Sequence, residues 1–157
     1  MIQIEKELST AKKASIKSAE LLTGKKTSIN NLISNEGRDV KLQADIESEK
    51  IIKNYLKEFS DLPILAEESG ANEYLGSSFW VVDPLDGTSN YSRDFPICCI
   101  SIALIHENKI TLGVINDFNR NIIYEGSTET PAMMNSKVIT VSDVSDKSKA
   151  TLATGLP

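Results

Sequence analysis

The sequence has few of the features that mark secreted or membrane proteins. Its two cysteines, Cys98 and Cys99, are adjacent, and adjacent cysteines form only strained disulfides and are too closely spaced for an ordinary metal site. The longest apolar stretch, Phe95 to Ile105, is too short to span a bilayer, and the N-terminal residues carry charges where a signal peptide is apolar. We therefore expect reduced thiols, no membrane partner and a cytoplasmic location.

Positive charge is also scarce. The chain has 17 Lys and Arg against 22 Asp and Glu, a net charge of −5, and its pI is about 5.0. No surplus of cations is present to neutralise a phosphate backbone, so we expect no nucleic-acid partner. A length of 157 residues excludes a TIM barrel, and an apolar fraction of 40% is enough for the core of one domain.

The hydrophobic pattern predicts two helices followed by strands. Apolar or small residues recur every three or four positions from Ile4 to Leu22 and again from Asp45 to Phe59, where Asp45 is a plausible N-cap. Polar residues at 25–38 predict a surface loop. Apolar runs predict strands at 63–66, 79–82, 97–105, 109–115 and 121–125, and residues 137–141 are a further candidate strand. We expect an α+β domain in which two N-terminal helices pack on a largely antiparallel sheet.

The segment from Trp80 to Asn90 carries the clearest chemical signal. Pro84 forces a turn directly after Asp83, so Asp83 and Asp86 can face one point with the Leu85 carbonyl between them. These hard oxygen ligands suit Mg²⁺. Gly87 and the residue after it can present backbone amides to an anion. An arbitrary Asp-x-x-Asp-Gly is also typical of a polar turn with two solvated aspartates.

A second acidic segment begins at Glu67, 16 positions before Asp83, where Glu67 and Glu68 end another candidate strand. If the two strands are neighbours, one of these glutamates meets Asp83 and Asp86. A third carboxylate there could hold a second metal and orient a water to which the Thr88 hydroxyl also bonds. Taken alone, Glu-Glu-Ser is typical of a solvated helix start.

These segments together resemble the inositol monophosphatase family of Mg²⁺-dependent, lithium-sensitive phosphatases. The resemblance is carried by Ala44-Asp45, Leu65–Ser69, Trp80–Tyr91 and Phe95-Pro96. It implies that residues 1–157 are the N-terminal α+β domain, the first half of an αβαβα fold. Family members carry a second half with a Trp-Asp-x-Ala-Ala-Gly-like segment, which this sequence lacks. We therefore expect an N-terminal fragment or a truncated product.

The resemblance also implies roles for individual residues. The implied metal ligands are Glu67, Asp83, the Leu85 carbonyl and Asp86. Glu67 and Thr88 would activate and position the attacking water, and the amides of Gly87 and Thr88 would bind phosphate. Asp45 would support the metal site, although a role as helix N-cap accounts for it equally well.

The implied function is Mg²⁺-dependent hydrolysis of a small phosphomonoester, such as inositol monophosphate, by metal-activated water. Such a phosphoric monoester hydrolase takes a small phosphorylated metabolite as its partner, forms a homodimer when full-length, and requires the missing half. Two alternatives stay open: a 3′(2′),5′-bisphosphate nucleotidase-type phosphatase, and a non-catalytic truncated domain that binds metal or protein. Glycoside hydrolysis by paired acids gives no role to Pro84 or Gly87.

Overall fold

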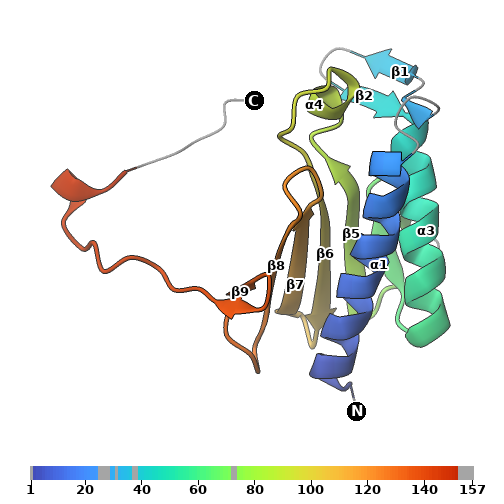
Figure 1. Cartoon of the computed structure of the whole chain (residues 1–157). Helices are drawn as coiled ribbons and strands as arrows, with labels where there is room; N and C mark the ends of the chain where they lie inside the picture. Colours follow the sequence, from blue (N-terminus) through green and yellow to red (C-terminus); the bar gives the residue numbers. More distant parts are fainter. Residues whose placement is uncertain (1, 25–28, 31, 37–38, 72–73, 152–157) are drawn as a thin grey trace.

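The structure is a computed structural model that describes residues 2–24, 29–30, 32–36, 39–71 and 74–151. Its regular elements follow one another along the chain (Figure 1). They are α1 (Ile4–Gly24), β1 (Leu32–Glu36), β2 (Asp39–Leu42), α3 (Gln43–Phe59), β3 (Ile64–Ala66), β4 (Gly70–Ala71), β5 (Phe79–Asp86), α4 (Thr88–Ser92), β6 (Cys99–His106), β7 (Lys109–Asp117), β8 (Ile122–Ser127), β9 (Met133–Met134), β10 (Lys137–Val138) and a 3₁₀ turn at Lys147–Lys149.

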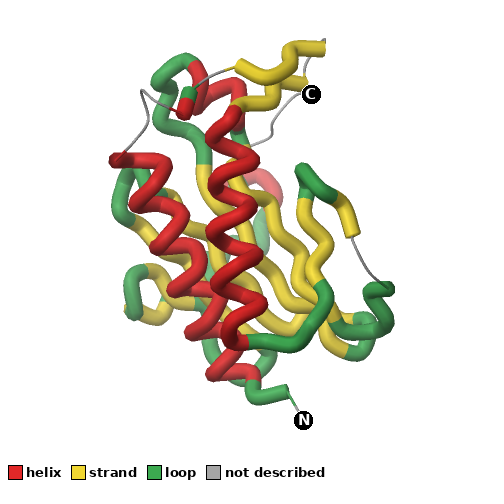
Figure 2. Tube along the Cα trace, turned by 90° about the vertical axis from the view of Figure 1, so that its right-hand side faces the viewer, coloured by secondary structure: helices red, strands yellow, loops and turns green. Residues whose placement is uncertain are grey.

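The two long helices, α1 and α3, lie side by side against one face of the sheet (Figures 1 and 2). Residues at helical spacing on α1, among them Leu8, Ala11 and Leu22, are buried, which confirms the first predicted helix. The second begins earlier than expected, at Gln43, so the prediction of Asp45 as N-cap was wrong. In the described chain, neither helix has the length and apolar character needed to cross a membrane.

The main sheet has eight strands in the order β10-β9-β8-β7-β6-β5-β3-β4. All neighbouring pairs are antiparallel except β3 and β5, which run parallel. The strands β6, β7 and β8 form the predicted antiparallel meander. The expected fold class, two helices on a largely antiparallel sheet, is therefore confirmed.

The core lies between this sheet and the two helices. Side chains alternate across a strand, so every second residue of β5 to β7 points toward α1 and α3. Trp80, Ile102, Leu104 and Val114 lie on that side and are almost completely buried. Neither α1 nor α3 lies on the opposite face of the sheet (Figure 1). Since Asp83 has the opposite orientation to Trp80 and Val82, it projects on this uncovered face.

Two expectations, one for a loop and one for a strand, need correction. The predicted loop at 25–38 contains β1, which pairs with β2, while residues 25–28, 31 and 37–38 lie outside the described chain. The possible strand at 137–141 is reduced to β10, because its partner β9 offers only two residues for pairing. Short elements of this kind are poorly signalled by periodicity, since the pattern needs several residues to emerge.

Candidate metal and phosphate site

The parallel pairing of β3 with β5 places Glu67 beside Asp83. Ala66 pairs with Val82, and the backbone N–H of Glu67 donates to the Val82 carbonyl at 3.0 Å. The carboxyl groups of Glu67 and Asp83 lie close enough together to shift each other's pKa. Two neighbouring carboxyl groups concentrate negative charge at this end of the strand pair.

The acidity of both groups is perturbed accordingly. Partial burial, reinforced by the charge of Asp83, raises the pKa of Glu67 to about 7. Burial and the nearby charge of Asp86 raise the pKa of Asp83. A carboxylate whose pKa lies near neutrality can accept and release a proton at physiological pH.

A one-residue bulge in β5 brings Asp86 to the same face of the sheet as Asp83. Residues three apart on a regular strand point to opposite faces. Here Asp83 pairs with Ser101 but Asp86 pairs with Cys99, so three steps along β5 match two along β6. Both aspartates therefore lie on the uncovered face. Asp83 Oδ1 also accepts the backbone N–H of Leu85 at 3.1 Å, which stabilises the bulge.

Gly87 ends the bulge with a left-handed backbone, φ 86°, and precedes the short helix α4. A Cβ atom at this position would lie 2.7 Å from the carbonyl oxygen of Ile97, so the chain passes too close for any side chain. Glycine is needed here both for its backbone angle and for space.

Thr88 connects the bulge to α3. Its hydroxyl lies 2.8 Å from Asp45 Oδ1 and 3.0 Å from the Leu85 carbonyl oxygen, both of which accept hydrogen bonds. The other carboxylate oxygen, Oδ2, accepts the backbone N–H of Leu42 at 2.7 Å. Burial raises the pKa of Asp45 to about 6, although these two hydrogen bonds favour its charged form. Asp45 thus lies behind Thr88, at the third residue of the helix.

The predicted site residues thus fall into two linked groups: Glu67 with Asp83, and Asp45 with Thr88 and Leu85. A groove of about 480 Å³ opens beside the first group; it is lined by Leu65, Ala66, Glu67, Gly70, Val81, Val82 and Asp83. No three His, Cys, Asp or Glu side chains of the described chain lie close enough together to hold a metal ion.

The donor set nevertheless fits Mg²⁺ in chemical type. Glu67 and Asp83 are neighbouring hard oxygen donors. After burial, the charge of Asp83 is the next cause of the raised pKa of Glu67, and a divalent cation would offset this repulsion. Asp86 lies on the same face, but its carboxylate does not complete a cluster of three. The structure thus brings two of the predicted carboxylate ligands into contact and leaves the third nearby.

Sequence reasoning missed three polar residues of α3 that reach the site: Ser48, Glu49 and Lys53. They bond to the Pro84 carbonyl, the Glu68 amide and the Ser69 hydroxyl respectively. A signal was available, because Ser48 and Glu49 share a helical face with Asp45 and with the apolar residues of the core.

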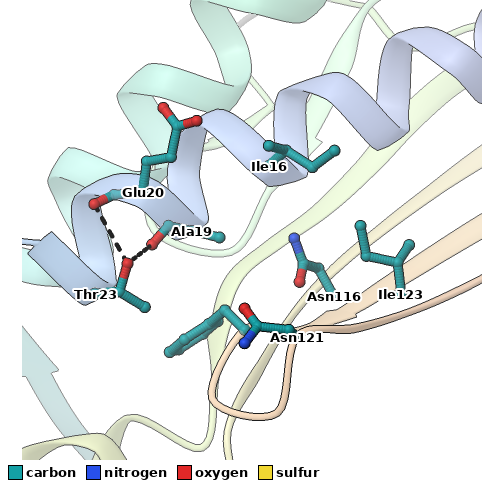
Figure 3. Close-up of a pocket in the computed structure, with 8 residues that line it drawn as sticks. Ile16, Ala19, Glu20, Thr23, Asn116, Asn121 and Ile123 are labelled. Atoms are coloured by element: carbon teal, nitrogen blue, oxygen red, sulfur yellow. Dashed lines mark hydrogen bonds between the residues drawn. The ribbon is translucent and has the colours of Figure 1, made fainter. Parts of the chain in front are cut away.

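A separate cavity of about 230 Å³ lies between α1 and the β7–β8 hairpin (Figure 3). It is lined by Ile16, Ala19, Glu20, Thr23, Asn116, Phe118, Asn121 and Ile123. The Thr23 hydroxyl is turned away from the cavity toward its own helix, where it donates to the Ala19 carbonyl at 2.7 Å. None of the predicted site residues lines this cavity.

Comparison with known proteins decides the family. The sequence model described as "Inositol monophosphatase family" matches residues 3–157. The chain belongs to the inositol monophosphatase family. This family is metal-dependent. The resemblance inferred from the Glu67 and Asp83 segments is therefore confirmed.

Individual members of the inositol monophosphatase family are similar to this chain in sequence. An inositol-1-monophosphatase of Synechocystis is 36% identical over 127 residues, which are 78% of this chain and 44% of that protein. The Nus factor SuhB of Xylella fastidiosa is 38% identical over 128 residues, covering 80% and 46%. The chain spans about half the length of these curated relatives.

Solved structures of related proteins share this fold, and this chain matches about half of each. The extragenic suppressor protein SuhB from Bartonella henselae superposes with a TM-score of 0.79 at 31% identity, covering 87% of this chain and 54% of that one. The inositol monophosphatase of Anabaena gives a TM-score of 0.76 at 30% identity, covering 90% and 52%. That residues 1–157 are specifically the N-terminal domain stays a prediction.

Proposed function

We propose that this chain supplies the metal- and water-binding part of a phosphomonoesterase that hydrolyses a small phosphorylated metabolite such as inositol monophosphate with Mg²⁺. The observation that carries this proposal is the convergence of Glu67, Asp83 and Asp86 on one sheet face, produced by the β3–β5 register and the β5 bulge. The 36% identity to an inositol-1-monophosphatase supports it. Because the chain spans about half of such relatives, we expect turnover to require the rest of the enzyme.

Four groups would hold Mg²⁺: the carboxylates of Glu67, Asp83 and Asp86 and the carbonyl oxygen of Leu85. The ion would neutralise phosphate charge and the leaving oxygen and lower the pKa of a bound water. The amides of Gly87 and Thr88 would donate to phosphate oxygens.

Proton transfer falls to Glu67 and Thr88. The carboxylate of Glu67 would take the proton of the attacking water. The single hydroxyl proton of Thr88 is directed to Asp45 or to the Leu85 carbonyl. The lone pairs of Thr88 Oγ1 would therefore accept a hydrogen from that water and orient it. No covalent phosphoenzyme is needed.

The test is phosphate release from inositol 1-phosphate by the natural gene product, measured with and without Mg²⁺. Glu67→Gln and Asp86→Asn should each lower Mg²⁺-dependent release by about 100-fold or more, which is typical for loss of a general base or a metal ligand. Glu129→Gln, an exposed acid on a distant loop, is the matched control and should leave the rate unchanged. Normal turnover by Glu67→Gln would refute the assignment.

The phosphate-release assay, together with Mg²⁺ calorimetry, distinguishes two alternative functions. Preferential release from a 3′,5′-bisphosphorylated nucleoside would favour the bisphosphate nucleotidase type. Mg²⁺ binding by calorimetry without release from any phosphomonoester would favour a non-catalytic domain. The absence of a three-carboxylate cluster among the described residues is the observation that keeps the second alternative open.

A further inference from the structure

One face of α3 carries polar side chains that are buried although they lie beside core residues. Asp45, Ser48 and Glu49 are each at most 5% exposed. The positions 45, 48–49 and 53 fall on successive turns of one helical face. A buried polar or charged side chain is costly unless it is hydrogen-bonded, so each of these residues needs a partner across the helix–sheet interface.

The partners are the two turns that carry the proposed metal ligands. Toward the β5 bulge, Asp45 accepts from Thr88, and the Ser48 hydroxyl donates to the Pro84 carbonyl at 2.7 Å. The Ser18 and Ser48 hydroxyls, 2.6 Å apart, extend this connection to α1.

Toward the turn after β3, Glu49 Oε2 accepts the backbone N–H of Glu68 at 2.9 Å. Lys53 Nζ donates to the Ser69 hydroxyl at 2.7 Å and lies 3.5 Å from Glu49 Oε1. Lys53 thereby neutralises the charge of Glu49 close to the acidic site. Glu49 and Lys53 thus connect α3 to two consecutive residues of the turn.

The hydrogen bond from the Glu68 N–H to Glu49 also constrains the backbone of Glu67, the residue before Glu68. A residue has only two soft backbone dihedrals, which set how its two flanking peptide planes are arranged. At Glu67 both planes are tethered: its own N–H bonds to the Val82 carbonyl of β5, and the next N–H, that of Glu68, bonds to Glu49 of α3. The β3 ladder ends here, so without Glu49 the second plane would lose this tether.

We propose that Glu49 is a positioning residue that fixes the backbone of Glu67 and so keeps the Glu67 carboxylate in contact with Asp83. The proposal rests on the proposed role of Glu67 in holding Mg²⁺ and activating water. Glu49 does not contact the substrate or the ion; it acts through the Glu68 amide.

The first measurement needs no metal. Amide hydrogen exchange of Glu68, followed by NMR in the metal-free protein, should be at least about tenfold faster in Glu49→Ala than in the wild type, because the N–H loses its acceptor. Glu47→Ala is the matched control. It removes an acid from the same helix, and among the described residues Glu47 is seen to accept a hydrogen bond from Gln43 of that helix and from no other residue. Equal Glu68 exchange in the two variants would overturn the proposal.

The second measurement is Mg²⁺ affinity by calorimetry together with kcat and KM for inositol 1-phosphate. Glu49→Ala should raise the Kd for Mg²⁺ about tenfold, the loss expected for one hydrogen bond to a charged group, and should lower kcat more than it changes KM. Glu49→Gln keeps a carbonyl acceptor for the Glu68 amide and should recover most of both losses, which also provides a folded variant if Glu49→Ala is unstable. Faster Glu68 exchange with unchanged Mg²⁺ affinity and kcat would overturn the positioning role.

Failure of the proposed function would give different results from failure of the Glu49 role. A wild-type protein that binds no Mg²⁺ and releases no phosphate would refute the function itself. Glu68 exchange in Glu49→Ala against Glu47→Ala would still show whether Glu49 fixes the turn.

Discussion

Gly87 offers a quantitative test of how tightly the site is built. The substitution is Gly87→Ala, and the matched control is Gly70→Ala. Both glycines have positive φ, 86° and 65° respectively. A Cβ atom at Gly70 would meet nothing within 4 Å, whereas one at Gly87 would lie 2.7 Å from the Ile97 carbonyl oxygen and 3.2 Å from the Cys98 Cα atom. The pair therefore separates backbone strain, which they share, from steric overlap, which only Gly87 has.

The expected magnitudes follow from these contacts. A left-handed backbone costs a non-glycine residue about 1–2 kcal/mol, and alanine regains about 0.4–1 kcal/mol through the lower entropy of the unfolded chain. Gly70→Ala should thus lower the free energy of unfolding by about 1 kcal/mol. At Gly87 the overlapping atoms belong to the backbone and cannot rotate away, so overpacking adds about 1–3 kcal/mol. We expect Gly87→Ala to cost about 2–4 kcal/mol, a large share of the 5–15 kcal/mol typical of a domain.

Urea unfolding followed by tryptophan fluorescence measures this difference. Trp80 is the only tryptophan of the chain and is 0% exposed in the folded state, so its emission reports unfolding directly. Equal destabilisation by the two substitutions would show that the Gly87 backbone does not approach Ile97 as closely as the structure has it, and would refute the steric argument.

Three further substitutions test other parts of the molecule. Glu7 is 7% exposed, its Oε2 has no hydrogen-bond partner among the described residues, and burial raises its pKa. Its contribution to stability is therefore present at low pH and is lost as the pH rises, so Glu7→Gln should gain stability over the wild type between pH 4 and pH 8 in thermal melts; a constant difference would contradict this. Leu56→Ala, at a fully buried position, should lower the free energy of unfolding by about 2–5 kcal/mol in urea, whereas Ile46→Ala, at an exposed position of the same helix, should lower it by less than about 1.5 kcal/mol; similar values would contradict the packing of α3. Thr88→Val removes the hydroxyl that joins Asp45 to the Leu85 carbonyl and should lower Mg²⁺-dependent phosphate release at least about tenfold, with Thr88→Ser restoring most of it; full activity of Thr88→Val would exclude the water-orienting role.

The sequence by itself determined the long elements and the chemical character of the site. Apolar spacing is a local property of the chain, so α1, α3 and the meander β6–β8 could be predicted from it. The two acidic segments around Glu67 and Asp83 were also recognisable, because their residue types and their positions at the ends of apolar runs are visible without any contact. The short strands β1 and β9 could not be predicted, since each contains only two apolar residues and therefore gives too little pattern.

Only the tertiary structure decided how the site is assembled. The parallel register of β3 on β5 set Glu67 against Asp83, and the bulge in β5 placed Asp83 and Asp86 on one face; a register shift of one residue would have separated them. The bond from Glu49 to the Glu68 amide joins residues 19 positions apart. Such partners are chosen by the packing of a helix on a sheet, where buried polar groups must find hydrogen bonds, and the sequence shows the polar groups without showing which atoms satisfy them.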